Sequence, residues 1–368
     1  MAIFTDVFED VTKQGRKIPT SDYHDSGLYP IIDQGQSKIA GYTDEENGLF
    51  TDVPAIIFGD HTRVLKYVDT PCFLGADGVK LLKAKIPDPN YKYLYYVLLS
   101  ADIPNTGYNR HFKWLKEVEI PLPSELEQQK IVERLDKISE LIALRKEQLA
   151  KLDRLVKSQF IELFGDPECS GKAIPTLPMT ELCEIIDGDR GKNYPKQEEF
   201  SGEGFCLFLN AKNVTSNGFS FENCMYITEE KDRILRNGKL SRGDVVLTTR
   251  GTLGNLAFYD ESIPYEHMRI NSGMVILRMK REYVTERFFI EQFKMQLASI
   301  KEKIASGSAQ PQLPISTMNK IMMLVPDVEQ QQEFTTFLEQ TDKSKLEIQQ
   351  SLDKLELLKK SLMQEYFG

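Results

Sequence analysis

Two long segments of the chain carry apolar residues at every seventh position, with further apolar residues interleaved between them. The first segment, 123–165, aligns without a gap on the second, 326–368. Each has a capping residue directly after its first Pro, Ser124 or Asp327, and no further Gly or Pro before its closing Phe-Gly. Because heptad spacing of apolar residues is typical of coiled coils, we expect two long helices that pack against each other antiparallel. The expected seam residues are Leu135, Ile142, Leu149, Val156, Leu338, Ile348, Leu352, Leu355 and Leu362.

The regions that precede the two long helices also resemble each other, though more faintly. Segments 78–83 and 273–278 both have the pattern of a short strand after a glycine, and helices are predicted at 91–100 and 285–304. The expected fold class is therefore α+β: two α/β modules separated by two long antiparallel coiled-coil helices, with an internal pseudo-two-fold repeat. The expected boundaries are 1–123 for the first module, 124–165 for the first long helix, 166–326 for the second module and 327–368 for the second long helix.

The composition is that of a globular protein with more than one domain. The chain has 368 residues and 41% apolar residues, which is enough for two hydrophobic cores. No window approaches the roughly 18 uncharged apolar residues of a membrane span, and the first residues lack a signal-peptide pattern, so we expect a cytoplasmic protein without a membrane partner. The net charge of −9 argues against a protein that coats polyanions by bulk charge. Any contact with nucleic acid must therefore be local.

The sequence contains no familiar catalytic or metal-binding motif. It lacks a phosphate-binding loop, a dinucleotide-binding glycine turn, a zinc-protease helix and the Asn-Pro-Pro-Tyr motif of amino-group methyltransferases. The four histidines have no metal-ligand spacing, and the five cysteines form no C-x-x-C pair, so they are predicted to be buried free thiols. We expect no catalytic residue, no metal and no cofactor in this chain.

Instead, both modules contain polar loops rich in Gly, Arg, Lys, Asn, Gln and aromatic residues. Arg can donate a bidentate pair of hydrogen bonds to guanine, Asn and Gln can pair with adenine, and Gly lets backbone amides approach a phosphate. An ordinary solvated loop explains any one of them equally well, but the recurrence of such loops in both halves favours a function. The candidate DNA contacts are His61, Thr62, Arg63, Tyr108, Asn109, Arg110, His111, Lys113, Arg190, Lys192, Asn193, Tyr194, Thr249, Arg250, Thr252, Ser308, Gln310 and Gln312.

Together these features resemble the specificity (S) subunit of type I restriction-modification enzymes. The resemblance lies in the segment PLPSELEQQKI at 121–131, the closing Phe-Gly of each long helix, the loop SGSAQPQLP at 306–314 and the order of modules and helices. It covers essentially the whole chain, and its most specific element is the duplicated helix with its Glu-Gln-Gln start.

The resemblance implies a non-catalytic subunit whose modules are target recognition domains, each reading one half of a bipartite, asymmetric target in double-stranded DNA. It implies that the long helices act as a spacer and dock two modification subunits, which methylate adenine at N6. S-adenosylmethionine, ATP and Mg are then expected on the partner subunits, and restriction/translocase subunits join through the complex.

Two other readings of the sequence stay open. One is a coiled-coil interaction scaffold without its own DNA specificity, which the acidity of the chain favours slightly. The other is an enzyme with an unfamiliar active site, for which the sequence offers no cluster of acid, base or nucleophile candidates.

Overall fold

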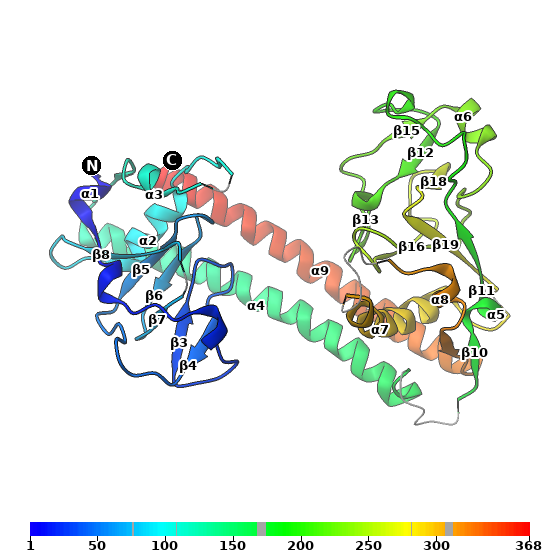
Figure 1. Cartoon of the computed structure of the whole chain (residues 1–368), viewed down its shortest axis with the longest axis horizontal. Helices are drawn as coiled ribbons and strands as arrows, with labels where there is room; N and C mark the ends of the chain where they lie inside the picture. The colour runs from blue at the N-terminus through cyan, green and yellow to red at the C-terminus, as the bar shows by residue number, and fades with distance from the viewer. Residues whose placement is uncertain (76, 108, 168–173, 281, 306–311) are drawn as a thin grey trace. The chain divides into compact units, whose positions relative to one another are not determined.

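The computed structural model describes residues 1–75, 77–107, 109–167, 174–280, 282–305 and 312–368 (Figure 1). The chain forms two compact units. Unit 1 comprises Met1–Gln148 and Ile348–Gly368, and unit 2 comprises Leu149–Glu347. Each unit therefore includes half of each long helix, whereas the sequence analysis treated each helix as a segment of its own.

Unit 1 is built on a four-stranded antiparallel sheet in the order β2-β8-β5-β6. Its central strand β5 is buried along its whole length, as its sequence AIIFG predicts. A second sheet has the order β4-β3-β7 with β3 and β7 parallel, and β1 pairs with β9. The strands are β1 Ala2–Ile3, β2 Phe8–Asp10, β3 Tyr29–Ile32, β4 Gly41–Thr43, β5 Ala55–Gly59, β6 Leu65–Val68, β7 Phe73–Leu74, β8 Val79–Ala84 and β9 Glu119–Ile120. The helices before the first long one are α1 Phe4–Val7, α2 Tyr91–Ser100 and α3 Phe112–Leu115, with short 3-10 turns at Thr12–Gln14 and Thr20–Asp22.

Unit 2 repeats this plan strand for strand. Its main sheet has the order β11-β19-β16-β17, its second sheet the order β15-β12-β18 with β12 and β18 parallel, and β10 pairs with β20. The hairpin β13-β14 has no counterpart among the described residues of unit 1. The strands are β10 Thr176–Pro178, β11 Cys183–Asp187, β12 Cys206–Leu209, β13 Val214–Thr215, β14 Gly218–Phe219, β15 Tyr226–Ile227, β16 Asp244–Thr248, β17 Leu256–Phe258, β18 Met268–Ile270, β19 Met274–Met279 and β20 Met322–Leu324. The shorter helices are α5 Met179–Leu182, α6 Glu229–Ile234, α7 Glu286–Ala305 and α8 Ile315–Met318, with 3-10 turns at Gln197–Glu199 and Ala211–Asn213. The internal repeat that the sequence predicts is confirmed.

The two long helices, α4 Glu125–Phe164 and α9 Val328–Phe367, pack antiparallel within each unit. In unit 1, Arg134 of α4 donates to the hydroxyl of Tyr366 at 2.9 Å, and Lys146 pairs with Glu356 at 2.7 Å. In unit 2, Lys345 Nζ lies 2.6 Å from Asp153 Oδ1. In these pairs the residue number rises along α4 as it falls along α9, which is the antiparallel pairing that the heptads predict. Of the expected seam residues, Leu135, Val156, Leu338 and Leu352 are buried, and Ile142, Leu149, Ile348, Leu355 and Leu362 are half-buried.

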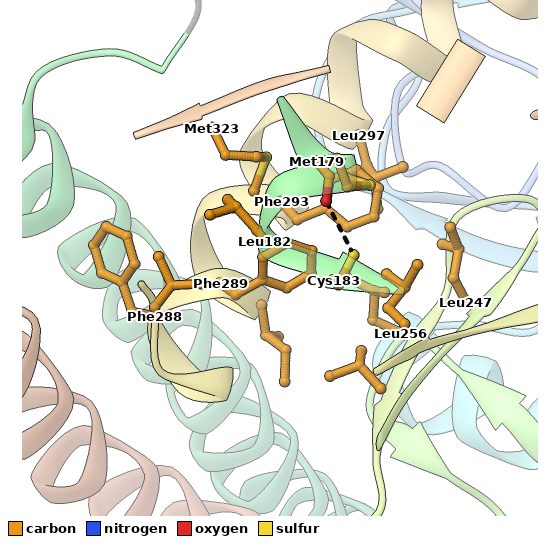
Figure 2. Packing of buried hydrophobic residues seen from close by; sticks show 14 of the residues in the cluster. Met179, Leu182, Cys183, Leu247, Leu256, Phe288, Phe289, Phe293, Leu297 and Met323 are labelled. Carbon is orange, nitrogen blue, oxygen red and sulfur yellow. Dashed lines mark hydrogen bonds between the residues drawn. The ribbon is translucent and has the colours of Figure 1, made fainter. Parts of the chain in front are cut away.

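Aromatic and aliphatic side chains from the long helices complete the core of each unit. In unit 2, Phe160 and Phe164 of α4 lie against Phe288 of α7 and Phe334 of α9, with ring centroids 5.0–5.6 Å apart. Figure 2 shows the neighbouring part of this core, where Met179, Leu182 and Cys183 lie among α7 and the main sheet. Aromatic groups of this size contribute the largest share of buried apolar area. The long helices are therefore part of the folded cores as well as the link between them.

The four cysteines among the described residues are free thiols. Cys72, Cys183 and Cys206 are buried free thiols, and Cys224 is half-buried and free. Burial raises the pKa of the thiols of Cys72, Cys183 and Cys206 to about 12. The prediction of buried free thiols is confirmed for these three, and Cys169 lies outside the described residues.

Candidate nucleic-acid interface

In unit 1, two of the polar loops singled out in the sequence meet at the end of strand β5. Asp60, the residue after β5, donates its backbone N–H to Gly78 O at 2.7 Å. Its own carbonyl accepts the N–H of His111 at 2.8 Å, and its carboxylate accepts the N–H of Phe112 at 2.8 Å. Asp60 is 5% exposed. One buried carboxylate therefore holds the turn after β5 against the loop that precedes α3.

His111 has a structural position rather than an exposed one. It is 0% exposed, its Nδ1 lies 3.0 Å from the carbonyl oxygen of Asp60, and its ring lies against that of Trp114 with centroids 5.4 Å apart. A side chain that solvent cannot reach cannot touch DNA, so its assignment as a direct contact is corrected. His111 instead closes the loop.

The neighbouring candidates are brought together by the same loops. His61 Nδ1 lies 3.2 Å from the carbonyl oxygen of Asn109, and the Thr62 hydroxyl donates to the carbonyl of Gln34 at 2.6 Å. Arg63, whose φ is 63°, is half-buried and donates to the carbonyl of Ile103 at 3.0 Å. Gln34, which is not among the predicted contacts, belongs to the same arrangement, because its side chain accepts from His61 N–H and donates to Asp77 O. We call this arrangement, residues 60–63 with 103–107, 109–111 and Gln34, the first loop cluster.

A cavity of about 500 Å³ lies beside the first loop cluster. Its walls are Asp60, Lys80, Arg110, Phe112, Lys113, Lys116 and Glu117, and we call it the cationic cavity. Lys80 Nζ and Lys116 Nζ lie 5.1 and 4.9 Å from the centre of the Phe112 ring, and Lys113 Nζ lies 4.1 Å from that of Trp114. Arg110 and Lys113 were predicted as contacts, whereas Lys80 and Lys116 were not. The three-residue spacing of Arg110, Lys113 and Lys116 was visible in the sequence, but the approach of Lys80 from strand β8 was not.

Lys80 is also paired with Asp10 of strand β2 at 2.9 Å. Burial has the largest effect on the pKa of the Asp10 carboxyl and raises it, but hydrogen bonds from Thr12 and Lys80 outweigh that effect and hold the pKa below its usual value. Asp10 is therefore ionised at neutral pH and balances the charge of Lys80.

Unit 2 contains an equivalent junction at the end of β16. Thr249, the residue after β16, donates its N–H to Gly273 O at 2.9 Å, and its carbonyl accepts the N–H of Leu313 at 3.1 Å. Asp60 makes the corresponding backbone bonds in unit 1. Thr249 is 4% exposed and its hydroxyl donates to Gly273 O at 3.0 Å. Its assignment as a direct DNA contact is corrected, since it is buried and holds the turn.

The loop after β11 joins the same junction. Arg190 is exposed, and its guanidinium donates to Asp187 Oδ1 at 3.1 Å and to Ser272 O at 3.2 Å. Asp189 is buried and accepts the N–H groups of Gly191 and Arg236 at 2.7 and 2.8 Å. Burial has the largest effect on the pKa of Asp189 and raises it, but these backbone hydrogen bonds together lower it below the usual value. We call residues 187–194, 249–252, 271–273 and 312–313 the second loop cluster.

The remaining candidates of the second loop cluster differ in exposure. Lys192, Arg250, Thr252 and Gln312 are exposed. Asn193 is half-buried and donates to Ile234 O at 3.4 Å, and the half-buried ring of Tyr194 packs edge-on against Phe208 at 5.7 Å. The exposed Arg236, which is not among the predicted contacts, also lies here, with its guanidinium close to Gly191. Tyr108, Ser308 and Gln310 lie outside the described residues.

Each cluster thus presents exposed Arg, Lys, Asn or Gln side chains on loops that buried hydrogen bonds hold in place. Such side chains can donate to phosphate oxygens and to base edges. Within the described ranges, no three His, Cys, Asp or Glu side chains gather in a way that could hold a metal ion. In the same part of the chain, no helix is long and apolar enough to cross a membrane.

Comparison with known proteins gives a consistent result. The family model described as "Type I restriction modification DNA specificity domain" matches residues 4–154 and 176–358. The type I restriction enzyme EcoR124I/EcoR124II specificity subunit of Escherichia coli is 30% identical over 34% of this chain and 34% of that protein, so the match spans about a third of the curated relative.

Among solved structures, the S subunit of the type I restriction-modification system from M. genitalium aligns with a TM-score of 0.55 at 19% identity, over 100% of this chain and 95% of that one. A chain from a study of complex assembly and conformational transition in the type I R-M system aligns with a TM-score of 0.54 at 16% identity, over 100% of this chain and 95% of that one. At these identities the two structures indicate a shared fold.

Proposed function

The chain belongs to the family of type I restriction-modification DNA specificity proteins, and from this premise we propose that it is the DNA sequence-recognition subunit of a type I restriction-modification complex. In this proposal the two loop clusters read the two halves of a bipartite, asymmetric target. The chain positions DNA and performs no chemistry itself.

The duplicated loop junction supports this proposal most directly. The turn after β5 and the turn after β16 are held by the same backbone hydrogen bonds, from Asp60 to Gly78 and from Thr249 to Gly273. The exposed side chains around them differ, however, with Arg110 in the first cluster and Arg250 in the second. A common scaffold with different readers is what two unlike half-sites require.

The long helices offer surface for the proposed partner subunits. On the helix halves of unit 1, Leu144 is 47% exposed and Leu357 is 69% exposed, and in unit 2 Leu346 is 59% exposed. Where such side chains form a contiguous patch, they mark protein interaction surfaces. We propose that two modification subunits dock on these helices and that restriction/translocase subunits join through them. S-adenosylmethionine, ATP and Mg would then be bound by those subunits.

The chain alone should bind DNA weakly. Its net charge is −9, so it gains little from the release of counterions, and the partner subunits must supply further phosphate contacts around a flipped adenine.

A gel-shift comparison tests the proposal. The full chain, alone and assembled with the modification subunits of its own system, is titrated with duplexes that contain the methylated sequence of the host or a scrambled version. The proposal predicts sequence-specific binding by the assembled complex only. Equal binding of both duplexes by the complex would instead favour an interaction scaffold without DNA specificity.

A further inference from the structure

The cationic cavity of unit 1 has an unusual charge balance in a chain that is acidic overall. Among the described residues, Arg110, Lys113 and Lys116 have no carboxylate partner, while Lys80 is paired with Asp10. Of the two acidic walls, Asp60 is 5% exposed and its carboxylate is occupied by the N–H of Phe112. Glu117 is the exposed acid of the cavity. Three cations without a carboxylate partner therefore share the cavity with two carboxylates, Asp60 buried and Glu117 exposed.

The cavity is preorganised by the core beneath it. The Phe112 ring is 8% exposed and lies 6.0 Å from the ring of Phe4 and 6.2 Å from that of Phe58. The ammonium groups of Lys80 and Lys116 lie over this fixed ring. Because the ring is buried and its backbone N–H is held by Asp60, the cations around it are grouped before any ligand arrives.

Unit 2 has the same helical turn at this place, but among its described residues none of the four cations has a cationic counterpart, and a lysine, Lys320, stands instead at the place of Glu117. Helices α3 and α8 correspond: Lys116 N–H donates to Phe112 O at 3.2 Å, and Asn319 N–H donates to Ile315 O at 2.9 Å. Asn319 is thus the counterpart of Lys116, and by the same alignment Ser316 is the counterpart of Lys113.

The two remaining cations are likewise replaced. In the main sheet of unit 1, Lys80 of β8 stands opposite Phe58 of β5 in the strand register. In unit 2, Val275 of β19 stands opposite Leu247 of β16 at the equivalent position. An apolar residue therefore takes the place of Lys80. In the loops before α3 and α8, Leu313 N–H donates to Thr249 O as His111 N–H donates to Asp60 O, so the uncharged Gln312 takes the place of Arg110. Among the described residues, this grouping of four cations is therefore found in unit 1 and not at the equivalent positions of unit 2.

We propose that the cationic cavity anchors a phosphate of the DNA backbone beside the first half-site, independently of base sequence, and that the second half-site has no equivalent anchor. This inference rests on the proposed function and adds an asymmetry to it. A phosphodiester offers only hydrogen-bond acceptors and a negative charge, which suits a group of Arg and Lys donors around a buried ring.

The salt dependence of binding tests the anchor. The variant Arg110→Gln/Lys116→Gln is made in the full chain, assembled with its modification subunits, and the dissociation constants for target and scrambled duplexes are measured at several salt concentrations. Loss of this one phosphate contact should reduce the magnitude of the slope of log K against log salt by about 0.9. Both duplexes should weaken by the same factor, and the methylated sequence should stay the same.

Lys13→Gln is the matched control, because Lys13 is an exposed lysine of the same unit outside the cavity. It should leave the slope unchanged. Thermal melting of each variant, compared with the unmodified complex, establishes that it is folded.

Each other outcome overturns the anchor. An unchanged slope in the double variant would show that DNA does not occupy the cavity, and weakening of the target duplex alone would make these residues base readers. Saturable binding of inorganic phosphate to the unmodified chain at micromolar concentration would identify a small anion as the ligand instead. If the unmodified complex binds target and scrambled duplexes equally, the proposed function is wrong, and so is the proposal that the cationic cavity binds a DNA phosphate.

Discussion

The substitution Gln292→Met should stabilise unit 2, although it removes a polar side chain. Gln292 lies in helix α7 and is 0% exposed, and neither its amide nitrogen nor its amide oxygen has a hydrogen-bond partner among the described residues. On the same face of α7, Phe288 and Phe289 belong to the hydrophobic core, and Gln296 is a second buried amide whose nitrogen donates to Met322 O at 2.8 Å. Gln292 is thus a buried amide without a hydrogen-bond partner among the described residues, on a helix face that is otherwise apolar except for Gln296.

The corresponding position in unit 1 shows what the fold requires there. Asn90 caps α2 by accepting the N–H of Tyr93, and Thr285 accepts the N–H of Phe288 in the same way before α7. Seven residues after each cap stand Val97, which is 2% exposed, and Gln292. Position 292 therefore accepts an apolar side chain in the repeated plan.

The expected gain follows from the cost of the unsatisfied amide. A buried polar group without a partner costs about 1–3 kcal/mol, and Met has a similar length, an unbranched stem and a helix propensity close to that of Gln. A gain of about 2 kcal/mol in the free energy of unfolding corresponds to about 4–8 °C in Tm for a unit of this size.

Urea denaturation followed by far-UV circular dichroism measures this gain. The reciprocal variant Val97→Gln is the matched control, and it should destabilise unit 1 by a similar amount. The single tryptophan, Trp114, lies in unit 1 and reports that change by fluorescence. Unchanged or reduced stability of Gln292→Met would mean that the amide is satisfied in the folded protein, and the reasoning would be wrong.

Three further predictions concern the hydrophobic core, the proposed DNA contact Arg250 and the buried thiols. Phe160→Ala should lower the free energy of unfolding by about 3–5 kcal/mol in urea denaturation, because the ring is 0% exposed; a loss below about 1 kcal/mol would contradict its place in the core. Arg250→Ala should relax recognition of one half-site at a cost of about 1–3 kcal/mol if Arg250 reads a guanine, as seen by methylation mapping; equal weakening on every sequence would make it a phosphate contact. At pH 8 iodoacetamide should alkylate Cys224 before Cys72 and Cys183, as followed by mass spectrometry, because burial raises the pKa of the latter two to about 12. Since folding keeps these two thiols protonated, their contribution to stability should be present below about pH 9 and be lost as the pH rises toward 12; equal labelling of all three would contradict the burial.

The repeated architecture could be predicted from the sequence because its signals are local. Heptad spacing predicted α4 and α9, and the glycine-led apolar runs predicted β8 and β19. Helix α2 was predicted at 91–100 and spans Tyr91–Ser100. The division of each long helix between two cores could not be predicted in this way, because it depends on contacts such as that of Phe160 with Phe334, which are far apart in the chain.

The sequence identified which loops form the candidate site, but not which residues of those loops are exposed. His111 and Thr249 have the composition of DNA contacts, yet tertiary hydrogen bonds turn both inward. Lys80 was missed because a lysine within a strand gives no sign of which loop its end will reach. Loop composition identifies where polar groups gather, whereas only the fold decides which of them face solvent.

Mapping of methylated adenines in cells that contain the chain with its modification subunits tests the central claim most directly. Two unlike loop clusters predict one bipartite, asymmetric sequence, methylated wherever it occurs and absent when the gene for this chain is deleted. A continuous palindromic sequence, or methylation that does not depend on this chain, would contradict the account.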